Sequence, residues 1–281
     1  MSNYLKTKNN LTERSITGII LAIIILGTVS WNLFGFIFLV LIIDLLSLLE
    51  FYRLFYSTDL LPRKVAGIIL SVSMLIACTL YVAGIISWKI LFVAIPIAFG
   101  IFVMELFHLS EKPFYNLAFT FLGVICITIP LCFFITLAFF PYPPGTYNLQ
   151  LVLGYFFILW ASDTGAYFIG KNFGIHHLFK RISPKKTWEG SAGGAASAIL
   201  VSYLLSYFFT FFPVIDWVFI AVIIIVTGTC GDLVKSMMKR SLNLKDSGTI
   251  LPGHGGMLDR FDSLLGSAPF VCCYLILFHH G

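Results

Sequence analysis

The chain has 281 residues, of which 59% are hydrophobic and 11% are charged, and its mean hydropathy is +0.95. This composition excludes an ordinary soluble domain and indicates a protein whose main solvent is lipid. The formal net charge of +5 does not indicate nucleic-acid binding, because the basic residues stand in short blocks between apolar runs, as in a membrane topology signal. At roughly 20 apolar residues per span, the chain has room for about eight to ten transmembrane helices.

Apolar runs and their breakers predict an all-α, polytopic integral membrane protein with about nine transmembrane helices. We divide the chain into N-terminal helices (1–110), central helices with a polar loop (111–189) and C-terminal helices with the densest polar motif (190–281). Pro96 and Pro130 should kink the fourth and fifth helices. The predicted helices cover residues 16–30, 33–54, 65–86, 88–107, 115–139, 149–170, 190–212, 214–241 and 258–279.

The Lys and Arg residues fall almost entirely on one side of the predicted membrane. With nine spans, all of the 18 except Lys89 share one face, which the positive-inside rule assigns to the cytoplasm. The longest loops on this face, 171–189 and 242–257, hold most of the Gly, Lys and His residues that could carry chemistry. We therefore expect an active site that faces the cytoplasm and a C-terminus on the outer side. Without an organellar transit signal, we expect a bacterial inner membrane.

The first chemical candidates lie near the end of the eighth predicted helix. An acidic group at membrane depth is costly and normally faces a polar cavity or a partner, so Asp232, and Asp163 two helices earlier, are functional candidates. For the basic residues near Asp232, snorkelling toward the lipid headgroups is an equally good interpretation. A single helical face carries Asp232, Lys235, Ser236, Lys239 and Arg240.

A glycine-rich segment, LPGHGGMLDRFD, follows this helix. Its glycines allow close backbone approach, and a helix that begins near Met257 would offer free N–H groups to a phosphate. Asp259 and Asp262 would project from one face of that helix. Because carboxylates cannot themselves bind phosphate, their place among cations suggests Mg²⁺ that bridges protein and phosphate oxygens. Helix capping is the alternative interpretation for both acidic residues.

Two polar segments lie further upstream, SDTGAYFIGKNFG and ISPKKTWEG. The second supplies Lys185, Lys186 and Thr187 just before the seventh predicted helix. Their charges and hydroxyl could bind a phosphate, or the two lysines could form a patch that contacts lipid headgroups. For Gly193 and Gly194, tight helix packing is the preferred interpretation.

The run SMMKRSLNLKDSGTILPGHGGMLDRFD, from Ser236 to Asp262, resembles the signature of the phosphatidate cytidylyltransferase family. The similarity includes the two upstream segments and is strong over residues 155–265, whereas the N-terminal half resembles the family only in length and hydropathy. The matching positions are Ser236, Lys239, Arg240, Lys245, Asp246, His254, Gly255, Gly256, Asp259, Arg260 and Asp262.

The resemblance implies a magnesium-dependent homodimer that makes CDP-diacylglycerol and pyrophosphate from CTP and phosphatidic acid for phospholipid biosynthesis. It implies that Asp232 and Asp259 bind the metal, with Asp262 and Asp246 as weaker candidates. Phosphoryl transfer to an ionised phosphate needs charge neutralisation rather than a general base. Four residues would neutralise the charge of the triphosphate and the lipid phosphate: Lys239, Arg240, Lys245 and Arg260. Ser236 and His254 would orient these substrates.

The polar loop and the glycine turn are our candidates for nucleotide binding. We expect the lysine pair to gather the anionic substrates and Lys239 and Arg240 to neutralise charge during transfer. The proposed nucleotide-binding residues are Lys185, Lys186, Thr187, Gly255 and Gly256.

Two other functions fit parts of the pattern. A CTP-dependent enzyme could act on another lipid phosphate or on an isoprenoid alcohol, but the complete pattern from Ser236 to Asp262 argues against it. An ion-coupled transporter would use Asp163 and Asp232 as ion ligands near the bilayer midplane. Against this reading, the polar groups gather on one side of the membrane and the sequence shows no inverted repeat.

Overall fold

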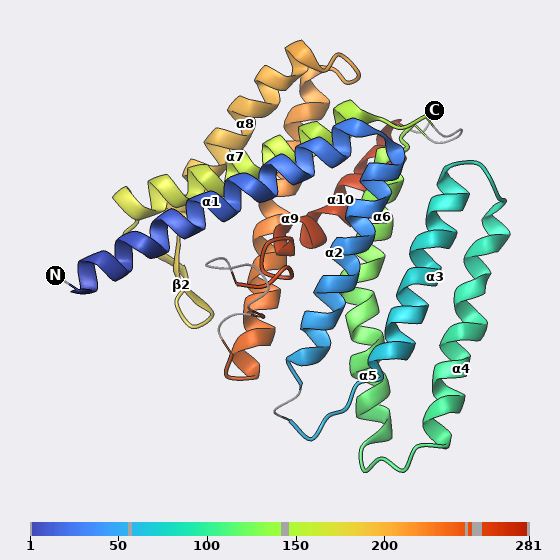
Figure 1. Cartoon of the computed structure of the whole chain (residues 1–281). Coiled ribbons are helices and arrows are strands. Elements are labelled where there is room, and N and C mark those ends of the chain that lie inside the picture. Colours follow the sequence, from blue (N-terminus) through green and yellow to red (C-terminus); the bar gives the residue numbers. More distant parts are fainter. Residues whose placement is uncertain (1, 56–57, 142–145, 245–246, 249–254, 280–281) are drawn as a thin grey trace. The chain divides into compact units, whose positions relative to one another are not determined.

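Figure 1 shows the computed structural model of the chain, which describes residues 2–55, 58–141, 146–244, 247–248 and 255–279. Long helices dominate these ranges, and eight of the helices found there are long and apolar enough to cross a membrane. The structure therefore confirms an all-α, polytopic membrane protein. The count of nine spans stays a prediction, because the apolar part of the first helix, Ile16–Trp31, is shorter than the roughly 20 residues that a span requires.

The chain folds into two compact units that interleave along the sequence. The predicted division into three sequence segments is a different one and stays a prediction. The N-terminal unit consists of Met1–Tyr81, Ile86–Ile129 and Leu244–Phe261, and the C-terminal unit consists of Val82–Ile85, Pro130–Asn243 and Asp262–Gly281.

The N-terminal unit is a group of apolar helices that also includes the glycine-rich segment. Asn32 caps α2, since its side chain accepts a hydrogen bond from the Gly35 N–H at 2.9 Å. The helices are α1 (Ser2–Trp31), α2 (Leu33–Arg53), α3 (Lys64–Val82), α4 (Ala94–Leu106) and α5 (Pro113–Gly123).

Irregular backbone occurs next to both prolines that were expected to disturb helices. A 3₁₀ turn, Trp88–Val93, leads into α4 just before Pro96. A π turn, Val124–Thr128, joins α5 to α6 (Ile129–Ala138), where Pro130 is the second residue. Proline has no N–H to donate, and a wide π turn such as the one before Pro130 is a usual accommodation of that loss inside a membrane helix.

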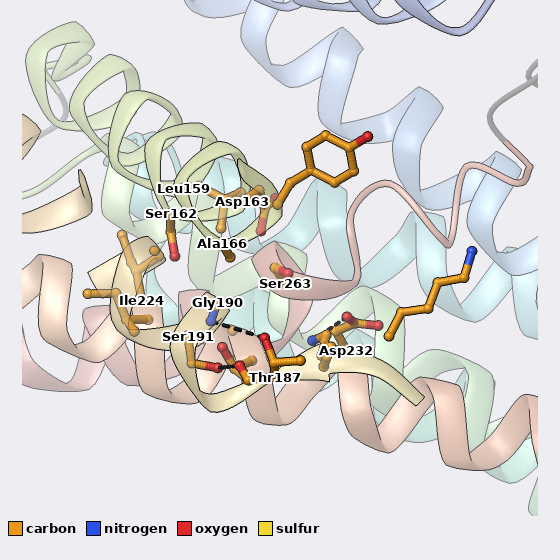
Figure 2. Close-up of a pocket in the computed structure, with 17 residues that line it drawn as sticks. Leu159, Ser162, Asp163, Ala166, Thr187, Gly190, Ser191, Ile224, Asp232 and Ser263 are labelled. Carbon is orange, nitrogen blue, oxygen red and sulfur yellow. Dashed lines mark hydrogen bonds and ion pairs between the residues drawn. The ribbon is translucent and has the colours of Figure 1, made fainter. Parts of the chain in front are cut away.

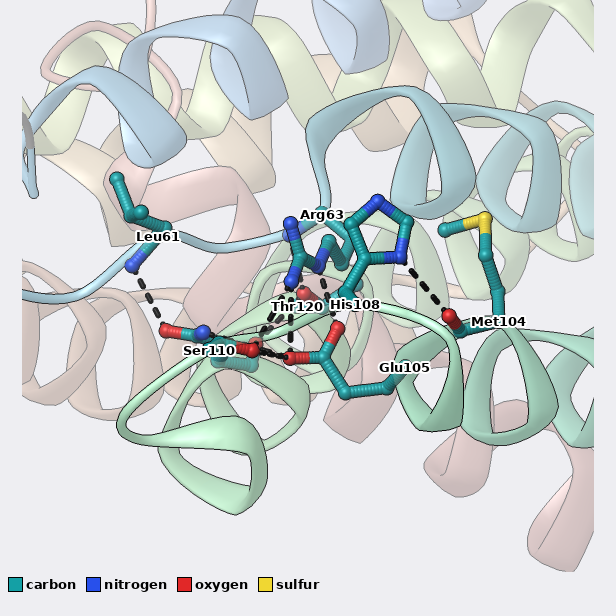
Figure 3. Close-up of polar contacts among 8 residues, drawn as sticks. Leu61, Arg63, Met104, Glu105, His108, Ser110 and Thr120 are labelled. Atoms are coloured by element: carbon teal, nitrogen blue, oxygen red, sulfur yellow. Dashed lines mark hydrogen bonds and ion pairs between the residues drawn. The ribbon is translucent and has the colours of Figure 1, made fainter.

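A partly buried polar network fixes the loops at one end of the N-terminal unit (Figure 3). Arg63, just before α3, forms an ion pair with Glu105 of α4, and its Nη2 lies 3.0 Å from Glu105 Oε1. Ser110 Oγ donates to the same oxygen at 2.6 Å, and the Leu61 N–H donates to Asn116 Oδ1 at 2.8 Å. These contacts connect the segment before α3 to the end of α4 and the start of α5.

The C-terminal unit is built from helix pairs in close contact, α7 with α8 and α9 with α10, and α8 also packs on α9. A short antiparallel hairpin between α7 and α8, which the sequence analysis did not predict, pairs His177 with Thr187. The elements are α7 (Leu149–Phe173), β1 (His177–Phe179), β2 (Ser183–Thr187), α8 (Trp188–Phe208), α9 (Val214–Ser241) and α10 (Asp262–His279).

Glycines allow these helix pairs to approach closely. A Cβ added to Gly194 would lie 2.7 Å from the Ser162 carbonyl oxygen, and one added to Gly193 would collide with Ile169. This confirms the packing interpretation of both glycines. Between α9 and α10, a Cβ on Gly231 would lie only 2.6 Å from the Gly266 Cα.

We predict that Gly231→Ala destabilises the protein, because the new methyl group would meet the backbone of α10 rather than a flexible side chain. Overpacking of this kind costs about 1–3 kcal/mol of unfolding free energy, which should lower the thermal midpoint measured in detergent. Gly100→Ala in α4 is the matched control, since nothing lies within 4 Å of its added Cβ. Equal midpoints for Gly231→Ala and the parent would contradict the close α9 to α10 packing.

Candidate functional site

The C-terminal unit contains a cavity of about 240 Å³ between α7, α8 and α9, and Ser263 of α10 also contributes to its lining. Figure 2 shows Asp163 of α7 and Asp232 of α9 beside this cavity, with Thr187 at the end of β2. Lys185 and Lys186 line it as well. The structure thus brings together residues that lie up to 104 positions apart in the sequence, from Leu159 to Ser263.

Asp232 receives two different partners at this cavity. Lys186 reaches it from β2, with Nζ 2.5 Å from Asp232 Oδ2, and both side chains are about a quarter exposed, at 28% and 24%. Ser236, one turn further along α9, donates to Asp232 Oδ1 at 3.2 Å. The helical face predicted from the i and i+4 spacing is therefore confirmed for these two residues, and the hairpin brings a cation to it.

Asp262, the first residue of α10, lies close enough to Asp232 for the two carboxyl groups to interact. Its Oδ1 also accepts the Ser263 N–H at 2.7 Å. Lys235 and Asp163 are close enough to Asp262 to act electrostatically on its carboxyl group. Two ionised carboxylates at such a distance repel each other strongly in a medium of low dielectric constant, so the pair requires a proton or a cation.

The hairpin before α8 is held by its own polar contacts. Thr187 caps α8, since its Oγ1 accepts the Gly190 N–H at 3.1 Å, and the residue is only 7% exposed. Glu189 accepts the N–H of Ile175 at 3.1 Å and lies 2.6 Å from His176 Nδ1. The structure therefore gives Thr187 a capping contact, whereas its predicted binding of nucleotide stays a prediction.

The predicted basic residues around the hairpin differ in their surroundings. Lys239 is 8% exposed, whereas Arg240 is exposed and its Nε lies 3.5 Å from the Ile182 carbonyl oxygen. Lys185 is exposed, although its neighbour Lys186 is not. Both lysines line the cavity, so the two differ in exposure rather than in location.

The glycine-rich segment in the N-terminal unit differs from the expectation. Residues 257–261 form a turn, and α10 begins only at Asp262, so Asp259 and Asp262 do not project from one helix as predicted. The N–H groups of Met257 and Leu258 are not free for a phosphate either, because they donate to the Glu50 carboxylate at 2.9 and 2.8 Å.

Asp259 is also involved in the fold of this segment. Its Oδ2 accepts the N–H groups of Ser247 at 2.9 Å and of Gly256 at 3.3 Å. Gly255 has a φ of 83°, a left-handed conformation that glycine adopts without strain. The helix prediction failed because carboxylates, one of them from a distant helix, accept the hydrogen bonds of this turn.

Glu50 is the residue that the sequence analysis overlooked. A carboxylate near the end of a predicted membrane helix was a signal as strong as Asp232, but its partners could not be recognised from the sequence. Arg260 is exposed. Among the described residues, no three His, Cys, Asp or Glu side chains converge to hold a metal ion by themselves. The predicted residues Lys245, Asp246 and His254 lie outside the described residues.

A model of the cytidylyltransferase family matches residues 12–278, which is nearly the whole chain. The chain belongs to the cytidylyltransferase family. Phosphatidate cytidylyltransferase from Staphylococcus aureus (strain COL) is 34% identical over 94% of this chain and 98% of its own length. The protein of the same name from Staphylococcus epidermidis (strain ATCC 12228) gives the same values. That of Bacillus subtilis (strain 168) is 44% identical over 47% of this chain and 49% of its own length.

For a cytidylyltransferase, the cavity in the C-terminal unit has a suitable combination of groups. Lys186 supplies positive charge at Asp232, and the pair of carboxyl groups offers oxygen ligands next to it. Oxygen ligands of this kind bind hard divalent cations, and ammonium groups bind phosphate oxygens. The arrangement can therefore accept a polyphosphate together with a cation.

Proposed function

We propose that this chain is a CTP:phosphatidate cytidylyltransferase that makes CDP-diacylglycerol and pyrophosphate from CTP and phosphatidic acid. The observation that carries the proposal is the match to relatives of this name over nearly the whole length of both chains. The cavity beside Lys186 and Asp232 supports it, because it opens among helices that are apolar enough to span a membrane, where a lipid substrate is at hand.

In the proposed reaction, a phosphate oxygen of phosphatidic acid forms a bond to the α-phosphorus of CTP. The bond from this phosphorus to the oxygen that bridges to the β-phosphate breaks, and pyrophosphate leaves with the electron pair. The attacking phosphate is already ionised, so the residues of the site have to align the two substrates and neutralise charge rather than remove a proton. Lys186 is the cation best placed for this role, with Ser236 and Asp232 fixing its surroundings.

The carboxyl pair formed by Asp232 and Asp262 fits the predicted Mg²⁺. Mg²⁺ is usually bound by one or two carboxylates together with substrate phosphates and water, so a third protein ligand is not required. A divalent cation there would offset the repulsion between the carboxyls and the charge of the triphosphate. Asp259, which the sequence analysis ranked beside Asp232, becomes a weaker candidate than Asp262, since an oxygen of Asp259 already accepts two N–H groups of its own turn. Asp246 lies outside the described residues and stays a weaker candidate.

The setting of the enzyme is proposed on sequence grounds. The concentration of Lys and Arg on one side supports a site that faces the cytoplasm of a bacterial inner membrane. The resemblance to the family supports a homodimer.

The purified chain in detergent or vesicles should transfer label from [α-³²P]CTP into lipid when phosphatidic acid and Mg²⁺ are both present. The labelled product should run with CDP-diacylglycerol, and one pyrophosphate should appear for each label transferred. Diacylglycerol and an isoprenoid alcohol serve as controls for the acceptor. Labelling of the alcohol instead of phosphatidic acid would favour the sister enzyme, and no labelling with any acceptor would overturn the proposed function.

Asp232→Asn should lower transfer on the order of 100-fold, because the amide has no charge with which to hold the cation or pair with Lys186. We also expect Mg²⁺ with CTP to raise the thermal midpoint of the parent but not of the variant. Asp59→Asn is the matched control, since the Asp59 side chain is 86% exposed and pairs with Lys112 at 3.3 Å. Parental activity of Asp232→Asn at saturating Mg²⁺ would remove Asp232 from the metal site.

The two neighbouring lysines should differ in their effects on kinetics. Lys186→Met should mainly lower kcat, because the ammonium group lies 2.5 Å from Asp232 within the site. Lys185→Met should mainly raise KM, because its exposed side chain can gather anionic substrates at the membrane surface. Steady-state kinetics with varied CTP and varied phosphatidic acid would separate the effects. A Lys186→Met enzyme with unchanged kcat would contradict this assignment.

A further inference from the structure

Glu50 is a buried carboxylate in a helix apolar enough to span a membrane, where no surrounding water offsets the cost of burying its charge. It lies near the C-terminal end of α2, and only 1% of the residue is exposed. A buried carboxylate is strongly destabilising unless hydrogen-bond donors surround it. The donors at Glu50 therefore decide what this residue does in the fold.

The donors come from the signature segment, 197 to 208 residues further along the chain. The Met257 N–H donates to Oε1 at 2.9 Å and the Leu258 N–H donates to Oε2 at 2.8 Å, so each oxygen binds one of two successive backbone N–H groups. Ser247 Oγ also donates to Oε2, at 3.3 Å. A side chain of α2 thus contacts both ends of the segment 247–258, and all of these residues belong to the N-terminal unit.

Two glycines of the segment are fitted to this carboxylate. A Cβ on Gly248 would lie 2.7 Å from Glu50 Oε1, and a Cβ on Gly256 would collide with Glu50 Oε2 and with Ser247 Oγ. The absence of side chains at these positions is therefore explained by the approach of Glu50. Gly256 was predicted to contact nucleotide, but its surroundings point first to this internal contact.

We infer that Glu50 is a positioning residue for the cytidylyl transfer reaction, which holds Ser247 and the turn at Met257 and Leu258 in place. This inference rests on the proposed function. The segment leads directly into Asp259, Arg260 and Asp262, the last of which forms the carboxyl pair with Asp232. Displacement of reacting groups by about 1 Å can cost on the order of 100-fold in rate, so loosening this anchor should slow the transfer.

The test is Glu50→Gln, which keeps the shape of the side chain. The amide has one acceptor oxygen and one NH₂ donor, so it can satisfy only one of the two facing backbone N–H groups. We expect kcat to fall about 10- to 100-fold with KM for both substrates within about threefold, because positioning rather than substrate binding is impaired. Hydrogen exchange of the peptide that covers residues 247–258 should become at least about tenfold faster.

The matched control is Asp44→Asn on the same helix. Asp44 is 0% exposed, but its carboxylate accepts from the hydroxyl groups of Ser71 and Thr128, which can rotate toward an amide. For Asp44→Asn, both kcat and the rate of hydrogen exchange in the peptide that covers residues 247–258 should stay at parental values. An equal loss in Asp44→Asn would indicate general damage to α2 and would overturn the inference.

Parental kcat and parental exchange in Glu50→Gln would also overturn it. If Glu50→Gln does not fold, Ser247→Ala removes only the contact to Oε2 and should lower kcat about 3- to 10-fold with faster local exchange. If Ser247→Ala kept the parental kcat and the parental rate of local exchange, the inference would be wrong. A parent chain that does not transfer label would overturn the proposed function, whereas the exchange measurement would still decide whether Glu50 anchors the segment.

Discussion

Acidic side chains inside membrane-spanning helices are the constraint on which much of this structure depends, because hydrocarbon offers no water to solvate a charge. Three of them in the N-terminal unit are satisfied in three different ways. Asp44 accepts from the Ser71 and Thr128 hydroxyls, Glu105 forms an ion pair with Arg63, and Glu50 accepts backbone N–H groups. Each solution connects segments that are distant in the sequence, so these charges act as cross-links between helices and loops.

The pair formed by Asp232 and Asp262 differs from these cross-links. Its two carboxyl groups interact with each other, and the cation that offsets the charge of Asp232 directly is Lys186. Such an arrangement is unfavourable for stability alone, because replacing like charges by apolar side chains would relieve it. The pair borders a cavity, and a binding reaction that brings a cation and phosphates can compensate its repulsion. Asp44 is fully enclosed and therefore structural, whereas the Asp232 side chain is 24% exposed beside a cavity, where it can take part in binding.

The helices were predictable from the sequence because lipid requires each span to satisfy its own backbone hydrogen bonds, so an apolar run is sufficient evidence. Asp232 and the packing glycines 193 and 194 were predictable for a related reason, since both are exceptions within such runs. The turn at Met257 was not, because its N–H groups bond to Glu50, 207 residues earlier. The contact between Lys186 and Asp232 also depends on a hairpin whose pairing has no local alternation of apolar and polar residues to reveal it.

Membership in a sequence signature and contact with the reacting groups are therefore separate properties in this cytidylyltransferase. Gly256 lies inside the signature from Ser236 to Asp262, yet its immediate neighbours are Glu50 and Ser247. Lys186 lies outside it, yet its ammonium group is 2.5 Å from Asp232. A glycine can be required because a buried carboxylate must approach the backbone, with no ligand involved. Roles in this site follow from the contacts of each side chain, and the carboxylates, rather than the glycines, define where those contacts are made.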